Sequence, residues 1–400
     1  MIKVLHTSDW HIGQSFYGYE RSDEQRDMLR QIADIARKEQ PDAIVVCGDI
    51  YHTATPSATA VSVYIDGMLQ IRRQCPSATI IVISGNHDSA VRMRSDSPLW
   101  QCADVHVCGG VARNADGTAD FDSTFIPIGS PAKAYVAAVP YCFGSNFPPV
   151  GDETLPPAER QAAYFEALAA HARTLGDLPR VLLAHLAVSG SDTTGQEQRN
   201  FDYEMVPVEE LGSAWDYIAL GHIHHPQTIG KARYCGTPIA VSFDEQCEHS
   251  VSIVEVERGA RPRITTRPIR NLRPVRTLPP SEPVAFDKML DLLDHFDSDE
   301  PAYLRANVLI SGPVPASAYE RAVQKLAGKN ARFCTFKWTR ETTDDIADTD
   351  TPDLTIEEFA TTDPIEIARL HYKRLFQQDI SPAEIDMLRQ AIDRAAPQNP

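Results

Sequence analysis

Five short runs of aliphatic and β-branched residues alternate with helical patterns in the first half of the chain. The runs lie at 2–7, 43–47, 79–83, 180–184 and 216–220. Apolar residues at helical spacing lie between them, at 22–39, 57–73 and 156–174. Continuous apolar strands separated by helices are typical of a sheet that is covered on both faces. The pattern therefore predicts an α/β fold.

The pattern changes in the second half of the chain. Residues 227–257 predict a series of short antiparallel strands, and residues 271–283, with four prolines, are interpreted as a linker. A smaller α+β unit follows, with strands predicted at 302–310 and 331–339 and helices at 284–296 and 315–328. Residues 341–353 are acidic and poor in apolar residues, which indicates a second linker. Two amphipathic helices are predicted to close the chain, at 363–376 and 382–395.

Length and composition narrow the class of protein. A chain of 400 residues is too long for one core, and the patterns divide it into 1–270, 271–345 and 346–400. No run of 18 apolar residues or N-terminal signal region is present, so no membrane segment is expected. The eight cysteines are scattered without a CxxC pair, which favours reduced thiols in a cytoplasmic protein.

The charge of the chain is unevenly distributed. The formal net charge is −17, and a uniformly acidic protein would repel DNA phosphates. However, residues 258–276 contain seven arginines and no acid, and residues 301–340 contain seven basic residues and one acid. These two segments could contact a DNA backbone, or their arginines could pair with neighbouring acids.

Five polar motifs follow the five predicted strands of the first half. They are Asp9-Trp10-His11, Gly48-Asp49, Gly85-Asn86-His87-Asp88, His185 and Gly221-His222-Ile223-His224. Functional groups of α/β folds gather at the carboxyl ends of strands, so these segments can converge on one site. Each motif alone is weak, but all five in this order predict a common site.

The residue types in these motifs suit two divalent metal ions. Carboxylates and imidazoles without thiolates favour Mn, Fe, Co or Zn. Asp49 has two oxygens and can bridge two ions about 3.5–4 Å apart. Two dications against two carboxylates leave a net positive charge, which suits a phosphate ester. The three glycines let the backbone turn tightly beside the ions.

These motifs resemble those of the calcineurin-like metallophosphoesterase superfamily over about the first 260 residues. The stretches 6–17, 85–89, 216–230 and 233–245 are closer still to the bacterial DNA nuclease subunits of that superfamily. The resemblance implies an α/β fold: a two-layer β-sandwich flanked by helices in the nuclease domain, 1–270. A small α+β capping domain with its linker, 271–345, and a C-terminal helical tail, 346–400, that binds a partner ATPase would follow.

The resemblance also implies roles for individual side chains. It implies two divalent ions, most commonly Mn²⁺, the first held by Asp9, His11, Asp49 and His224 and the second by Asp49, Asn86, His185 and His222. His87 would protonate the departing sugar oxygen, a task that suits imidazole because it titrates near neutral pH. His52 corresponds to a second histidine near the scissile phosphate in some relatives. Alternatively, His52 is a loop histidine that only forms hydrogen bonds.

The implied activity is manganese-dependent cleavage of DNA by a hydroxide that attacks in line with the leaving 3′ oxygen. It comprises 3′-to-5′ exonuclease action on duplex ends and endonuclease action on hairpins and blocked ends. An SMC-like ATPase would be the partner and would control access through its ATP cycle. The apolar stripes of the tail helices would dock on that partner, or would pack on each other. A homodimer is expected through helices near 57–73 and 89–101.

Two alternatives compete with the nuclease hypothesis. Phosphatases of the superfamily carry GDxxDRG and GNHE, whereas this chain reads GDIYHTA at 48–54 and GNHDS at 85–89. A non-catalytic scaffold for an ATPase would not need all seven ligands and His87. Both comparisons favour the nuclease.

Other residues near the motifs have open roles. Asp88 is expected to orient His87 or to cap the helix that follows it. His6 is expected either to support the site or to be buried in a strand. Phe16 and Tyr17 are aromatic residues that could stack on a nucleotide, although packing is the commoner role.

Overall fold

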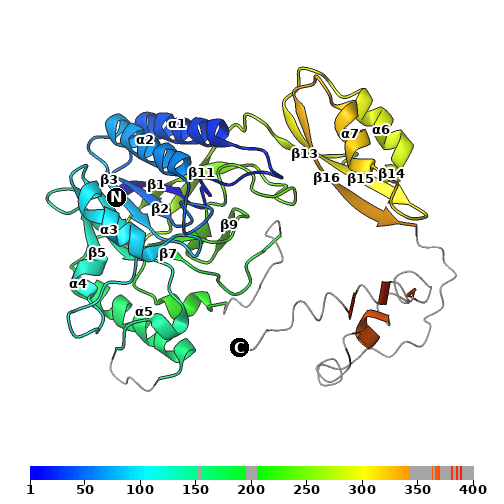
Figure 1. The fold of residues 1–400 in the computed structure, drawn as a ribbon. Coiled ribbons are helices and arrows are strands. Elements are labelled where there is room, and N and C mark those ends of the chain that lie inside the picture. Colours follow the sequence, from blue (N-terminus) through cyan, green and yellow to red (C-terminus); the bar gives the residue numbers. More distant parts are fainter. Residues whose placement is uncertain are drawn as a thin grey trace. The chain divides into compact units, whose positions relative to one another are not determined.

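The computed structural model describes most of the chain (Figure 1). The described residues are 1–150, 155–194, 205–341, 363, 365–369, 380–381, 384–385 and 388–389. They fall into two units, Met1–Arg340 and Glu341–Pro400, and the first unit holds every strand given below.

The first sheet has six strands in the order β12-β11-β1-β2-β3-β4. The strands are β1 (Ile2–Thr7), β2 (Ala43–Cys47), β3 (Thr79–Ile83), β4 (Val105–Cys108), β11 (Ser250–Val256) and β12 (Arg263–Pro268). The strands β1 to β4 run parallel, β11 pairs antiparallel with β1, and β12 pairs antiparallel with β11. The strands predicted at 2–7, 43–47 and 79–83 are confirmed.

The second sheet also has six strands, in the order β5-β6-β7-β8-β10-β9. The strands are β5 (Phe125–Ile128), β6 (Ala134–Val139), β7 (Arg180–His185), β8 (Tyr217–Gly221), β9 (Gln227–Ile229) and β10 (Ala232–Tyr234). The inner strands β6, β7, β8 and β10 are parallel, and the edge strands are antiparallel to them. The antiparallel series predicted for 227–257 is therefore wrong in part, since β10 pairs parallel with β8.

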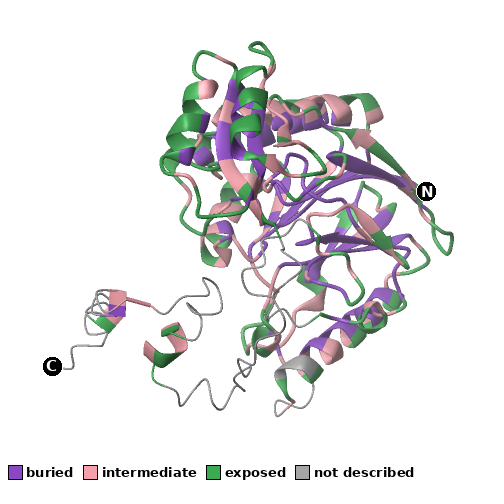
Figure 2. Ribbon diagram, turned by 90° about the vertical axis from the view of Figure 1, so that its right-hand side faces the viewer, coloured by how far each residue is buried: buried purple, intermediate pink, exposed green. Residues whose placement is uncertain are grey.

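The two sheets pack face to face, and helices cover their outer faces (Figure 2). Val4 and Val45 contribute to the core between the sheets, whereas Leu5 and Ile44 contribute to the core beneath the helices. Neighbouring residues of one strand thus enter two different cores, which is why these strands are apolar without alternation. The predicted two-layer β-sandwich flanked by helices is confirmed.

The covering helices bury apolar side chains against the sheets. The helices are α1 (Ser22–Glu39), α2 (Ala58–Gln74) and α3 (Ala90–Gln101) on the first sheet and α5 (Pro157–Thr174) on the second, with short turns α4 (Phe121–Thr124), η1 (Gly144–Asn146) and η2 (Val208–Leu211). In α1, the buried residues Met28, Leu29, Ile32 and Ala36 recur at helical spacing. Acidic residues in its first turn and basic residues in its last turn favour the helix dipole.

A smaller α+β layer follows the sandwich. It contains β13 (Val275–Leu278), β14 (Val284–Ala285), β15 (Ala302–Ile310), β16 (Ala331–Arg340), α6 (Phe286–Asp294) and α7 (Ala318–Lys325). The other three strands all pair with β15 in parallel orientation. Leu304, Ala306 and Val308 of β15 pack against both helices. We call residues 271–340 the cap.

The linker predicted for 271–283 is wrong in part, because this segment contains the strand β13. Its prolines flank the strand at Pro274, Pro279 and Pro280, so all four strand residues keep the N–H groups needed to pair with β15. The boundaries predicted at 270 and 345 stay predictions.

Most of the predicted tail, 346–400, lies outside the described residues, including Leu370, Leu375, Phe376 and Ile392. Within the described ranges, none of the helices combines the length and apolar character that would be needed to cross a membrane.

Candidate metal centre

The carboxyl ends of five parallel strands bring the five motifs together. Asp9 and His11 follow β1, Asp49 follows β2 and Asn86 follows β3, all in the first sheet. The second sheet supplies His185 at the end of β7 and His222 and His224 after β8. Direct hydrogen bonds join the two sheets here, since the His185 imidazole contacts the Cys47 carbonyl at 2.7 Å. The structure thus brings all seven predicted ligands to one edge of the sandwich.

The backbone is strained at this edge. The described residues include eight non-glycine residues with positive φ, and four of them are candidate ligands: Asp9 (53°), His11 (43°), Asp49 (49°) and His222 (98°). Left-handed backbone at a non-glycine residue costs energy and persists where the surrounding structure enforces it, often at functional sites. The left-handed conformation directs these side chains toward the common site soon after their strands end.

Asp9, His11 and His224 form the first half of the site. Their ligand atoms all lie within 4.8 Å of one another. His11 Nε2 lies 3.2 Å from His224 Nε2. Two nitrogens bound at about 2.0–2.1 Å to the same ion would lie about 3 Å apart, so this spacing fits one cation. His11 Nε2 is thus the nitrogen that faces the site, whereas His11 Nδ1 is buried without a hydrogen-bond partner within the described residues.

Asn86, His185 and His222 form the second half. Asn86 Oδ1 lies 2.9 Å from both His185 Nε2 and His222 Nδ1. His185 Nδ1 donates to the backbone carbonyl of Cys47, which leaves the lone pair of Nε2 directed at the site. One amide oxygen and two imidazole nitrogens therefore converge as ligands of a second cation would.

Asp49 lies between the two halves. Its Oδ1 is 3.6 Å from His185 Nε2, and its Oδ2 is 3.8 Å from His11 Nε2. Oδ1 also accepts the backbone N–H of His87 at 2.9 Å. Each oxygen of this carboxylate thus faces a different half, as a bridging ligand requires.

Burial and neighbouring charges together set the protonation of the site. It raises the pKa of Asp9 to about 6 and lowers the pKa of His222 to about 3. Burial also opposes ionisation of Asp49, but His185, His11 and His87 outweigh it and hold the pKa of that carboxyl below its usual value. A neutral His222 beside an ionised Asp49 is the state in which these two residues can bind a metal ion.

Glu245 supports His224 and was not identified from the sequence. It is 3 % exposed, and its Oε1 accepts His224 Nδ1 at 2.9 Å. Burial disfavours a charged His224, but the carboxylate outweighs it and raises the pKa of this imidazole to about 9. A carboxylate on the outer nitrogen of a metal-binding histidine fixes its orientation. The one signal in the sequence was indirect: Glu245 ends the stretch 233–245 that carries the resemblance, but no local pattern links it to His224.

Asp88 has a different role from either of the two expected. Its carboxylate accepts the backbone N–H groups of Gly85 at 2.8 Å, Ile50 at 3.1 Å and Tyr51 at 2.9 Å. The cap of α3 is Ser89 instead. Asp88 thus joins the loop after β2 to the loop after β3, which positions Asp49 relative to Asn86.

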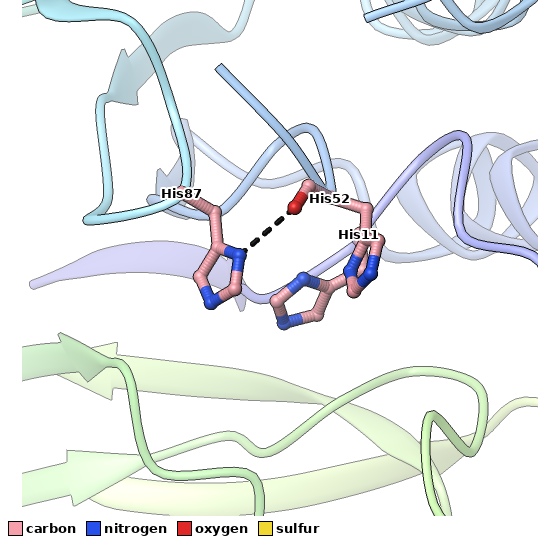
Figure 3. A group of neighbouring side chains, drawn as sticks. All are labelled: His11, His52 and His87. Carbon is pink, nitrogen blue, oxygen red and sulfur yellow. Dashed lines mark hydrogen bonds between the residues drawn. The ribbon is translucent and has the colours of Figure 1, made fainter. Parts of the chain in front are cut away.

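His87 and His52 lie together beside His11 (Figure 3). His87 Nδ1 donates to the backbone carbonyl of His52 at 2.9 Å. The centroid of the His87 ring is 5.0 Å from that of His11 and 5.7 Å from that of His52. The structure therefore places both predicted catalytic histidines at the first half of the site.

For His6 and Phe16, the structure supports the packing role over the alternative role at the site. His6 is fully buried in β1, where Nδ1 shares a 2.8 Å hydrogen bond with the Tyr217 hydroxyl. Phe16 is buried against Phe243, so it is not available to stack on a nucleotide, whereas Tyr17 is half exposed.

Ion pairs engage five of the seven arginines of 258–276 and three of the seven basic residues of 301–340. The pairs in 258–276 are Arg258 with Asp177 and Asp216, Arg263 with Glu255, Arg267 with Glu39, Arg273 with Glu24, and Arg276 with Glu300. Those in 301–340 are Arg305 with Asp244, Arg321 with Asp287, and Lys325 with Asp294. For 258–276, these pairs favour the alternative in which the arginines pair with acids rather than form a continuous DNA-binding surface.

The chain is similar to several known proteins. The family model for calcineurin-like phosphoesterases matches residues 2–226. SbcD, the nuclease subunit of SbcCD, from Rhodobacter capsulatus is 32% identical over 308 residues, which cover 73% of this chain and 75% of the relative. The protein of the same name from Bacillus subtilis is 33% identical over 273 residues, which cover 64% of this chain and 67% of the relative. The crystal structure of a dimetal phosphatase from Danio rerio aligns with a TM-score of 0.41 at 14% identity, over 68% of this chain and 97% of that chain.

Proposed function

The chain belongs to the calcineurin-like phosphoesterase family and, within it, to the family of the SbcCD nuclease component SbcD, and we propose that it is the nuclease of an SbcCD complex. In this proposal it is a manganese-dependent, ATP-regulated DNA nuclease. It degrades duplex ends from 3′ to 5′, opens hairpins and cuts blocked ends, in DNA repair, recombination and replication. The convergence of seven candidate ligand side chains, with Asp49 between the two halves of the site, is the observation that carries the proposal.

Two Mn²⁺ ions are proposed as the cofactors. Asp9, His11, Asp49 and His224 would hold the first ion, and Asp49, Asn86, His185 and His222 would hold the second. Oxygen and nitrogen donors without thiolate fit this metal. When bound, the two ions supply the positive charge that polarises the phosphodiester and lowers the pKa of a water molecule.

His87 is proposed as the acid that protonates the leaving 3′ oxygen. Its Nδ1 proton is engaged by the His52 carbonyl, so Nε2 is the nitrogen that donates. His52 contributes at least this carbonyl, and its imidazole, near His87 and His11, is proposed to contact the scissile phosphate.

The proposed partners are SbcC, an SMC-like ATPase that binds the C-terminal helices of 346–400, and a second copy of this chain. Exposed apolar side chains on α2 and α3 support the homodimer: Ile65, Val91 and Leu99. The complex would act in the cytoplasm, on the nucleoid.

A pull-down of SbcC with and without residues 350–400 tests whether the tail binds SbcC, and unchanged binding would contradict that role.

A cleavage assay tests the function. The purified chain, with Mn²⁺ and a hairpin-ended duplex labelled at its 3′ end, is incubated with and without SbcC and ATP. We expect hairpin opening followed by release of the 3′ label. Asp49→Ala should abolish both, whereas Asp116→Ala, in an exposed turn, should leave both unchanged. An intact complex without activity, or an Asp49→Ala variant as active as the wild type, would refute the proposal.

A further inference from the structure

The cap touches two segments next to the first metal half: the loop after the ligand His11, and the segment that holds Glu245, the partner of the ligand His224. Tyr303 and Arg305 stand two residues apart on β15, so their side chains lie on the same face of that strand. Tyr303 packs against Phe16, whose ring centroid is 4.9 Å away and which lies in the loop after His11. Arg305 reaches the segment Phe243–Glu245, which ends at the carboxylate that holds His224.

Arg305 binds this segment through two contacts. It donates to the Asp244 carboxylate at 2.7 Å, and its guanidinium carbon lies 5.2 Å from the centroid of the Phe243 ring. Its Nε donates to the Thr277 hydroxyl of β13 at 3.0 Å, which anchors it to the cap. The Arg305 side chain is only 10 % exposed, so loss of its partner leaves a poorly solvated charge.

Glu245 follows Asp244 in the chain and connects the Arg305 contact to the metal site. Its Oε1 holds His224 Nδ1, while Oε2 accepts the Thr237 hydroxyl at 2.7 Å and the Val241 N–H at 3.2 Å. The Val241 carbonyl in turn accepts from the Gln14 side chain at 2.9 Å, and Gln14 lies three residues after His11. The segments behind His11 and His224 are thus tied to each other as well as to the cap.

We propose that Arg305 is a positioning residue for the first metal ion, acting from the cap through Phe243 and Asp244 on Glu245 and through Glu245 on the His224 imidazole. This rests on the proposed dimetal site. It makes occupancy of the metal site depend on how the cap sits against the nuclease domain, so a partner or a DNA end that moves the cap changes the affinity for metal.

Calorimetric titration of the metal-free full chain with Mn²⁺ tests the proposal. Coupling energies along packed networks correspond to about two- to thirtyfold, so Arg305→Gln should weaken one of the two sites by that factor and leave the other unchanged. Glu245→Gln should weaken the same site by about 10- to 100-fold. Because Arg305 acts through Glu245, the double variant should bind no more weakly than Glu245→Gln alone.

Arg321→Gln is the matched control. Arg321 also combines an ion pair, with Asp287 at 3.3 Å, and a ring contact, with Phe286 at 4.7 Å, but both partners lie in the cap. It should leave both affinities unchanged. Asp244→Asn removes the same ion pair by changing its exposed partner, Asp244. It should weaken the same metal site, and it keeps the proposal testable if Arg305→Gln folds poorly.

Two results would overturn the inference: wild-type Mn²⁺ affinities in both Arg305→Gln and Asp244→Asn, or a double variant whose loss is the product of the two single losses. A chain that binds two Mn²⁺ ions but cuts no DNA would refute the nuclease proposal, while these affinities would still decide the role of Arg305.

Discussion

At the residue scale, the site could be predicted because its chemistry is local in sequence. All seven ligands and His87 lie in motifs of one to four residues directly after strands, and each motif carries its own signal. The supporting groups are different. Glu245 lies 21 residues from His224, and Asp88 binds backbone 37 and 38 residues away. Such partners are chosen by the folded chain, and a local pattern does not reveal them.

Replacing His87 separates proton donation from metal binding. His87→Gln should lower kcat for DNA cleavage by about 10²- to 10⁴-fold, the usual contribution of a general acid. Mn²⁺ affinity should stay unchanged, because His87 is proposed as an acid rather than a ligand. Single-turnover cleavage and a Mn²⁺ titration measure the two effects. His106→Gln, in β4, is the control and should keep wild-type kinetics; a His87→Gln variant with wild-type kcat would contradict the role.

His6 makes the stability of the fold depend on pH. Burial, with help from the charge of Arg233, lowers the pKa of His6 to about 3 from an ordinary 6.5. Between these values the unfolded chain binds a proton that the folded chain does not, so stability falls as pH falls below about 6.5. At about pH 4.5 this one group should cost about 3 kcal/mol relative to neutral pH.

Urea unfolding of the wild type and His6→Gln at both pH values measures this cost. The variant should lose about 3 kcal/mol less on acidification, since other titrating groups are shared by both proteins. His295→Gln, at the end of α6, should behave as the wild type. Equal pH dependence in His6→Gln and wild type would show that the His6 imidazole is not kept neutral by the fold.

At the element scale, strands with continuous apolar runs and long helices were predictable, and short or proline-flanked strands were not. α1 follows its apolar spacing residue for residue, at Ser22–Glu39. In contrast, β4 and β5 have four residues each, too few to show a period. β13 is hidden among prolines, and only its long-range pairing with β15 makes it a strand. Elements that depend on distant partners carry little local signal.

The turn between β2 and Asp49 has room only for glycine. Gly48 has φ of +89°, and a Cβ there would lie 2.4 Å from His185 Nδ1 and 2.8 Å from the Gly85 backbone. Gly48→Ala should therefore destabilise the fold by more than the about 1–2 kcal/mol of left-handed backbone alone, and should displace His185.

Gly176→Ala is the matched control, because Gly176 has φ of +80° and a Cβ added there would meet no atom within 4 Å. Thermal unfolding and Mn²⁺ titration of both variants should show a larger loss of stability for Gly48→Ala and weaker metal binding in that variant only. Equal effects in the two variants would mean that the contact with His185 does not constrain the turn.

At the scale of the whole molecule, the acidic charge is compatible with the proposed DNA substrate. The net charge is −17, and most basic residues of 258–276 are paired with acids. A chain of this kind does not hold DNA over its whole surface. Two dications at the strand ends would instead provide a local positive charge. DNA binding would then depend on the metal ions, on the second copy of this chain in the proposed homodimer and on SbcC together.

The two bound ions should also stabilise the fold by linking the two sheets. The first sheet supplies Asp9, His11, Asp49 and Asn86, and the second supplies His185, His222 and His224, so metal binding joins both layers. A ligand present at about 100 times its dissociation constant stabilises a fold by about 2.7 kcal/mol per site. For a domain of this size that corresponds to a rise in Tm of about 5 °C or more. Removal of Mn²⁺ with a chelator should reverse this rise in Tm, as followed by differential scanning fluorimetry.

Asp49→Ala removes the bridging ligand, so the Tm of this variant should respond only weakly to Mn²⁺. If the wild-type Tm does not change between chelator and saturating Mn²⁺, the metals do not connect the two sheets, and the assignment of ligands from both layers is wrong.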